Sequence, residues 1–384
     1  MKSVWKYENK APLGLYVHIP FCVQKCNYCD FLSFSADEKT KRQYVDALVK
    51  EMKGWREKTS DYELDTIFIG GGTPSVLSVS DMDILFQGLS DCFFRSQKPE
   101  FTVECNPGTV NEEKLSLYRQ AGVNRLSFGM QSTMDEELRQ LGRIHNYEQF
   151  LASYELGRRM GFDNMNVDIM SAVPEQTLKS YETTLHRITE LAPEHISSYS
   201  LIIEEGTPFY ERYADSPPVD EGTDRRMYEC TEEILAAAGY MRYEISNYAR
   251  PGRECRHNIK YWRRSEYLGL GLGAASQMGD CRFSNLRNLE AYLSVLQTGG
   301  DVVEEREELS LTDEKAEFMY LGLRMMQGIS VKEFETNFGE TLEDCYGEEI
   351  TRCERQGLLE CQGDRIFLTK RGIDVSNRVF AEFV

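Results

Sequence analysis

The 384-residue sequence predicts an α/β fold, in which a parallel sheet is followed by a smaller α+β domain. Short apolar runs alternate with amphipathic helical stretches from the start of the chain to about residue 200. Six βα units in a row imply parallel strands with helices on their outer face. After the acidic stretch 301–308 the pattern changes to helices and a short β-wing. A partial (β/α)6 barrel and a doubly wound sheet both satisfy this pattern.

The first half of the chain supplies six predicted strands with helical sequence between them. The strand 13–18 leads through a cysteine-rich loop into the helix 39–55, whose Tyr44, Leu48 and Met52 share one face. Ser80 is the predicted N-cap of the helix 80–93, and Gly122 closes the helix 111–121. The other predicted strands are 66–70, 101–105, 124–128, 165–169 and 195–201.

The second half is less regular. It contains a helix over 224–239, a strand over 240–245, a turn-rich segment over 248–255 and a glycine-rich run over 269–273. The pattern then predicts three helices, over 312–326, 331–338 and 342–356, and a wing strand over 365–368. We therefore expect a core of residues 1–300, with its barrel over about 10–205, and a winged-helix-like domain of residues 301–384. Because that domain is acidic, we expect it to pack or bind a partner rather than to bind DNA.

Composition narrows the class of function. The net charge of −19 disfavours nucleic acid and anionic membranes as partners. No apolar run is long enough for a membrane helix, and residues 1–8 lack the apolar core of a signal peptide. Eleven cysteines form no dense, even-numbered framework. We expect a cytoplasmic protein with no integral membrane segment and no nucleic-acid partner.

Three cysteines stand close together in the loop after the first predicted strand. Cys22, Cys26 and Cys29 have the spacing C-x3-C-x2-C, with Tyr28 directly before the last of them. Three thiolates can hold three corners of an iron–sulfur cube and leave the fourth iron open for another ligand. A zinc site is the alternative, but zinc needs a fourth ligand and the next cysteine is Cys92.

Polar and glycine residues follow the later strands at the same predicted edge. The run Gly70-Gly71-Gly72-Thr73 ends the second strand, and Glu104 ends the third. Gln131, Arg143 and Asp168 fall at or near later strand ends. Ligands bind at the carboxyl ends of strands in such sheets and barrels, and glycines there permit close approach of a ligand. These side chains can pair with the hydroxyl, amine and carboxylate groups of a ligand.

The cysteine spacing resembles the signature of the radical S-adenosylmethionine (SAM) superfamily. Six segments resemble, in the same order along the chain, the oxygen-independent coproporphyrinogen III oxidase family. They are 15–22, 70–74, Glu104, 125–131, 142–145 and Asp168. The resemblance implies a partial (β/α)6 barrel, a [4Fe–4S] cluster on the three cysteines and SAM on its open iron. It also implies that the first SAM contacts Tyr16, Gly71, Gly72, Thr73 and Glu104, and that a second SAM contacts Gln131, Arg143 and Asp168.

Two features depart from the oxidase. Phe31 stands where the oxidase has a further cysteine, and His257-Asn-Ile-Lys-Tyr261-Trp262 matches an H-N-x-x-Y-W motif. Both features resemble the HemW branch, the radical SAM heme chaperones, over essentially the whole chain. This resemblance implies heme as cargo and client hemoproteins as partners, and His257 is the candidate axial ligand.

Two other functions stay open at this point, coproporphyrinogen III oxidation and plain electron transfer. The sequence also leaves open which hemoprotein is the client, whether SAM is cleaved, and whether the chain forms a homodimer.

Overall fold

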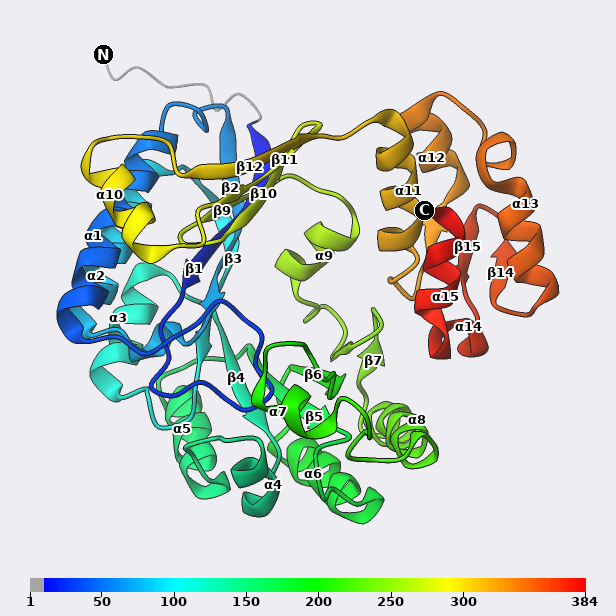
Figure 1. Ribbon diagram of the computed structural model, residues 1–384, viewed down its shortest axis with the longest axis horizontal. Coiled ribbons are helices and arrows are strands. Elements are labelled where there is room, and N and C mark those ends of the chain that lie inside the picture. The colour runs from blue at the N-terminus through cyan, green and yellow to red at the C-terminus, as the bar shows by residue number, and fades with distance from the viewer. Residues whose placement is uncertain (1–9) are drawn as a thin grey trace.

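The computed structural model describes residues 10–384 and is built around one curved 12-stranded sheet (Figure 1). The amino-terminal segment in which no signal peptide is expected lies outside these residues. Six strands pair in parallel and in chain order, as an open barrel does. They are β1 (Ala11–Ile19), β2 (Tyr62–Gly71), β3 (Arg95–Cys105), β4 (Arg125–Gln131), β5 (Met165–Ser171) and β6 (His195–Ser200). The predicted α/β class and partial barrel are confirmed. The doubly wound alternative is excluded because the order of these six strands in the sheet follows the chain and does not reverse.

Helices follow these strands and cover the outer face of the sheet (Figure 1). They are α1 (Glu38–Trp55), α2 (Val79–Cys92), α3 (Glu112–Ala121), α4 (Asp135–Gln140), α5 (Tyr147–Arg159) and α6 (Leu178–Leu191). Gly122 ends α3 with a φ of 95°, as predicted. The N-cap of α2 is Ser78 and not Ser80, because the Ser78 hydroxyl accepts the Asp81 N–H.

The sheet continues beyond the barrel on both sides. Beside β6 lie β8 (Asn247–Ala249) and β7 (Met241–Arg242). Beside β1 lie β9 (Tyr267–Leu270), β10 (Ala275–Met278), β11 (Cys281–Asn285) and β12 (Val303–Glu308). The predicted strand 240–245 is wrong in length, since only Met241 and Arg242 pair in the sheet and Glu244 forms an isolated bridge with Met325. The intervening helices are α7 (Pro208–Tyr213), α8 (Glu221–Ala237), α9 (Arg256–Trp262) and α10 (Leu289–Gln297).

The carboxyl-terminal residues form a separate helical unit with a core of its own (Figure 1). It contains α11 (Leu311–Gly322), α12 (Val331–Phe338), α13 (Leu342–Arg355), α14 (Lys370–Asp374) and α15 (Ser376–Phe380). Its three-stranded sheet is β13 (Ile329–Ser330), β15 (Arg365–Leu368) and β14 (Leu359–Gln362). The division of the chain into residues 1–300 and 301–384 stays a prediction. The acidic stretch at that division forms β12, which pairs with β11.

The alternation of side chains along each barrel strand separates packing from function. In β4, Leu126, Phe128 and Met130 are buried in the main core, whereas Arg125 and Gln131 face a cavity inside the barrel. Helices therefore pack on one side of the sheet while polar side chains gather on the other. Over residues 10–384, no helix is both long and apolar enough to cross a bilayer.

Candidate cofactor and ligand cavities

The three cysteines lie around one small cavity at the carboxyl ends of the barrel strands. Cys22, Cys26 and Cys29 line a space of about 130 Å³ in the loop between β1 and α1. None of them forms a disulfide, and each is partly exposed. Thr73 Oγ1 lies 3.5 Å from Cys22 Sγ, and an Arg143 Nη1–H donates to Cys26 Sγ over 3.6 Å. Hydrogen-bond donors of this kind stabilise thiolates.

The glycine run after β2 lies directly beside this cavity. Gly71 has a φ of +111°, and a Cβ there would come within 2.5 Å of the His18 ring. A Cβ on Gly72 would lie 3.1 Å from Cys22 Sγ and 2.8 Å from the Phe21 carbonyl oxygen. Glycine is therefore required at both positions if the cysteine loop is to lie this close to the strand. Thr73 follows with its side chain lining the same space.

This donor set fits a cluster better than a single ion. Among the described residues, no three Cys, His, Asp or Glu side chains converge tightly enough for one metal ion. A four-iron cluster is larger, and its ligands stand farther apart. A fourth free cysteine, Cys105, also lines the cavity, but it lies on β3 and its buried thiol donates to the Val103 carbonyl oxygen over 3.7 Å. The three thiols of the one loop are therefore suited to a cluster with one open iron.

Two half-buried carboxyl groups, Glu104 and Asp168, line the same cavity. Burial first, and then the nearby Asp168, raise the pKa of Glu104 to about 8. Burial likewise raises the pKa of Asp168, although its carboxylate accepts an Asn166 Nδ2–H over 2.7 Å. Glu104 also accepts the Gly71 N–H over 3.1 Å, which fixes it against the glycine run. A cationic ligand between these two groups would favour the ionised form of both.

Arg143 and Gln131 complete the rim. An Arg143 Nη2–H donates to Asn106 Oδ1 over 2.8 Å, and Asn106 Nδ2 in turn donates to Thr73 Oγ1 over 2.6 Å. Gln131 ends β4 with a φ of +73°, which directs the chain out of the sheet at the cavity edge. Asn106 was not predicted from sequence, although it follows Glu104 by two residues at the same strand end.

A second, larger cavity of about 550 Å³ continues from the first into the barrel. Its walls include the aromatic and apolar side chains of Phe68, Met170, Tyr199 and Ile202. Phe31 and Ile202 stand at its mouth with exposed fractions of 62% and 68%. The residues that line both cavities are Tyr28, Cys29, Phe31, Glu104, Ser127, Gln131 and Asp168. A ligand in the barrel would thus lie next to whatever the cysteines hold.

Tyr16 lines the larger cavity and is tied to the cysteine loop through a histidine. Its hydroxyl lies 2.9 Å from His18 Nδ1, and His18 Nε2 lies 2.9 Å from the Leu32 carbonyl oxygen. Burial lowers the pKa of His18, so the ring is neutral at neutral pH. Tyr28 lines both cavities, and burial raises its pKa.

The helix α9, which carries the H-N-x-x-Y-W motif, closes the amino-terminal end of the barrel. The Glu100 carboxylate of β3 accepts the N–H groups of Arg256 and His257, each over 2.9 Å, and so caps the helix. His257 Nδ1 lies 2.9 Å from Thr66 Oγ1, and its Nε2 lies 2.9 Å from the Tyr261 hydroxyl. His257 thus lines the cavity floor, and as a heme ligand it would have to release one of these two bonds. Burial lowers its pKa to about 3.

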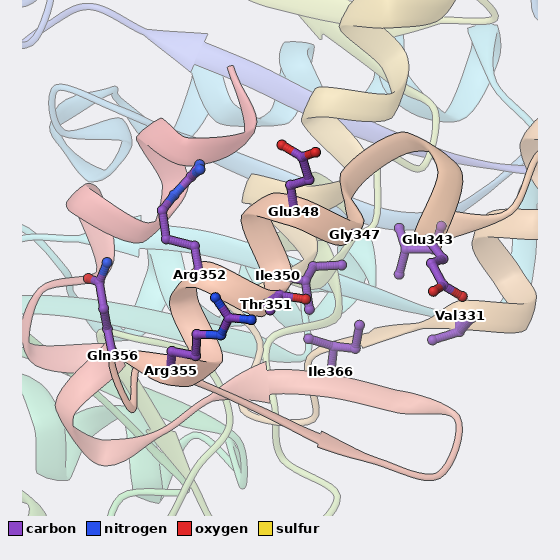
Figure 2. Close-up of a pocket in the computed structure, with 11 residues that line it drawn as sticks. Val331, Glu343, Gly347, Glu348, Ile350, Thr351, Arg352, Arg355, Gln356 and Ile366 are labelled. Carbon is purple, nitrogen blue, oxygen red and sulfur yellow. The ribbon is translucent and has the colours of Figure 1, made fainter.

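Another hollow lies in the carboxyl-terminal unit. A groove of about 940 Å³ runs along α13 in the carboxyl-terminal unit, with Val331 and Ile366 on its facing wall (Figure 2). Its side chains mix both charges, as in Glu348 and Arg355, and include no cysteine or histidine. The cavities that contain cysteine, histidine and half-buried carboxyl groups are therefore the two inside the barrel.

Comparisons with known proteins agree with this geometry. Residues 16–188 match the model of the radical SAM superfamily, and residues 309–375 match the HemN carboxyl-terminal domain. The protein named heme chaperone HemW from Bacillus subtilis is 36% identical over 96% of this chain and 98% of its own. Its namesake from Lactococcus lactis is 36% identical over 98% of both chains.

A solved structure with the same fold is coproporphyrinogen III oxidase (HemN) from Escherichia coli. It superposes with a TM-score of 0.88 and covers 97% of this chain and 90% of that one, at 24% identity. The likeness extends through the carboxyl-terminal unit and so covers the whole architecture. The near full-length matches to the curated relatives at 36% identity place this chain in the HemW family of radical SAM proteins.

Proposed function

We propose that this protein binds heme in its barrel cavity and transfers it to client hemoproteins. As a radical SAM protein it uses a [4Fe–4S] cluster and SAM. Its curated relatives carry the name heme chaperone. The observation that carries the proposal is the 550 Å³ cavity, which has aromatic and apolar walls and opens next to the cysteine cavity. Cavities of a few hundred Å³ with apolar walls and a few polar groups are typical sites for organic ligands.

We assign the cluster to Cys22, Cys26 and Cys29. The bound cluster would supply a single electron and an open coordination position to SAM. The hydrogen bond from Arg143 to Cys26 Sγ and the contact of the Thr73 hydroxyl with Cys22 Sγ support this assignment. Thr73 and Arg143 also line the space where the ligand of the open iron would lie. The residues that contact the sulfur atoms are therefore close to that ligand as well.

SAM would occupy the space between the cysteines and the two half-buried carboxyl groups, Glu104 and Asp168. Its amine and sulfonium are cationic, and Glu104 and Asp168 are the groups whose raised pKa values such a ligand would lower. The remaining residues proposed to contact SAM are Tyr16, Tyr28, Gly71, Gly72, Thr73, Gln131 and Arg143.

Heme would lie deeper, against the aromatic wall of the barrel. His257 stays a candidate axial ligand, at the cost of a hydrogen bond to Thr66 or Tyr261. The Phe68 ring stacks on the His257 ring with centroids 5.3 Å apart, which places a flat aromatic surface at the same floor. Client hemoproteins are macromolecular partners, so the exposed Phe31 and Ile202 at the mouth are the residues we expect them to meet.

The test is an anaerobic titration of the cluster-reconstituted protein with heme, followed by the Soret band. We expect saturation at a single heme per chain. A matched pair of variants locates the site, since Ile202 lies at the mouth and Met241 is equally exposed outside the cavity. Ile202→Glu should weaken heme binding roughly 10-fold because a charge is brought against an apolar ligand, and Met241→Glu should not change it.

A parallel sample receives coproporphyrinogen III, SAM and a reductant. Formation of protoporphyrinogen without saturable heme binding would refute the chaperone proposal. Equal effects of Ile202→Glu and Met241→Glu would refute the location of heme in the barrel.

A further inference from the structure

One buried arginine of the barrel has no role in the site described so far. Arg125 begins β4, is 2% exposed, and lines the 550 Å³ cavity. It is the only Lys or Arg among the described residues that line this cavity. Within residues 10–384 its Nε has no hydrogen-bond partner, and no carboxylate lies within ion-pair distance of its guanidinium. A buried cation without a direct partner is costly.

The acidic groups around Arg125 are committed to other partners. Glu100 accepts the first N–H groups of α9 and the Cys255 thiol. The Asp168 carboxylate accepts from Asn166. Both carboxyl groups act on Arg125 through space only, together with Cys255 and Tyr243. The protein thus places two carboxyl groups near the guanidinium and leaves its five donors free of side-chain acceptors among the described residues.

We propose that Arg125 binds a carboxylate group of the molecule that occupies the barrel cavity. A guanidinium pairs with a carboxylate through two parallel N–H···O bonds, and burial of the guanidinium strengthens that pair. The inference rests on the proposed function in so far as the ligand is heme, whose propionates are carboxylates. The same chemistry is present in the carboxylate of SAM. Arg125 would then fix the depth and orientation of the ligand, and the apolar wall would bind its body.

The experiment compares heme with heme dimethyl ester, in which both carboxylates are masked. The wild-type protein should bind heme roughly 10- to 100-fold more tightly than the ester, as expected for one charge-assisted bidentate pair. In Arg125→Met this ratio should fall to about one, because the variant loses affinity for heme and not for the ester. Arg125→Lys keeps the positive charge but not the two parallel N–H donors, so its ratio of heme to ester affinity should lie between those of the wild type and Arg125→Met. Arg159→Met, on the exposed end of α5, is the matched control and should keep the wild-type ratio.

The outcomes separate the two proposals. Equal affinity of the wild-type protein for heme and ester, with unchanged SAM affinity in Arg125→Met, overturns the inference. If Arg125→Met loses affinity for SAM while its affinity for heme stays unchanged, the carboxylate that Arg125 binds is that of SAM. If the wild-type protein binds neither heme nor ester, the proposed function fails, and the SAM titration still decides the role of Arg125. If Arg125→Met does not fold, the comparison of heme with ester on the wild type and Arg125→Lys decides it.

Discussion

Replacing Gly71 by alanine should be among the most destabilising single-methyl changes in this protein. Two costs add at this position. An L residue at φ +111° costs about 1–2 kcal/mol, because its Cβ meets the backbone. The new Cβ would also come within 2.5 Å of the His18 ring, and overpacking of that kind costs about 1–3 kcal/mol. We therefore expect the free energy of unfolding to fall by roughly 2–5 kcal/mol.

Two other glycines separate these costs. Gly161 has a φ of +84°, but no atom lies within 4 Å of the Cβ that alanine would add, so Gly161→Ala should cost about 1–2 kcal/mol. Gly54 lies inside α1 with open space around it, and Gly54→Ala should stabilise by about 0.5–1 kcal/mol. Urea unfolding of the cluster-free protein measures all three. If Gly71→Ala is no worse than Gly161→Ala, the close contact with His18 does not exist and the described geometry of the glycine run is wrong.

Three further changes test the site and the fold. Cys22→Ala should abolish cluster reconstitution, measured as bound iron and sulfide, whereas Cys361→Ala, at an exposed cysteine, should leave it unchanged; equal loss would refute the assignment. Burial raises the pKa of Glu51 to about 7, so its contribution to stability is complete below about pH 4.5 and is lost as pH rises through about 7. In Glu51→Gln the free energy of unfolding should no longer fall with rising pH by the about 3 kcal/mol that Glu51 contributes, as measured by unfolding titrations at several pH values. If the pH profile of the variant is identical to that of the wild type, the prediction for Glu51 is wrong. Arg324→Met takes the partner from the buried Glu244 carboxylate, which lies 3.9 Å away, and should cost about 1–3 kcal/mol in the same assay; no change would show that this pair does not hold the carboxyl-terminal unit.

Local patterns were sufficient for the barrel strands and most helices. The period-2 strands and their helices repeat regularly, so their order predicted the parallel sheet. The pattern failed between residues 240 and 262, where β7 is two residues long and α9 is capped by Glu100 from a distant strand. Short elements of this kind are stabilised by tertiary contacts, which a local pattern does not contain.

The candidate site divides in the same way. Close spacing along the chain predicted that Cys22, Cys26 and Cys29 share a cavity, because one loop carries all three. The strand-end rule likewise predicted the gathering of Glu104 and Asp168 at one rim. Arg125 escaped prediction, because a charged residue at the start of a strand normally points to solvent. Tertiary neighbours such as Cys255, at the start of α9, and Tyr243, before β8, make that position an interior one.

The hydrogen bonds of His18 determine which way the Tyr16 hydroxyl points. The Leu32 carbonyl can only accept, so His18 carries its proton on Nε2 and presents a lone pair at Nδ1. The Tyr16 hydroxyl must donate to that lone pair, and what it offers the cavity is an acceptor. A ligand group facing Tyr16 must therefore bring a hydrogen of its own, and a bare carboxylate is rejected there. Arg125, which lines the same cavity, offers N–H donors instead, so the two residues select different polar groups of one ligand.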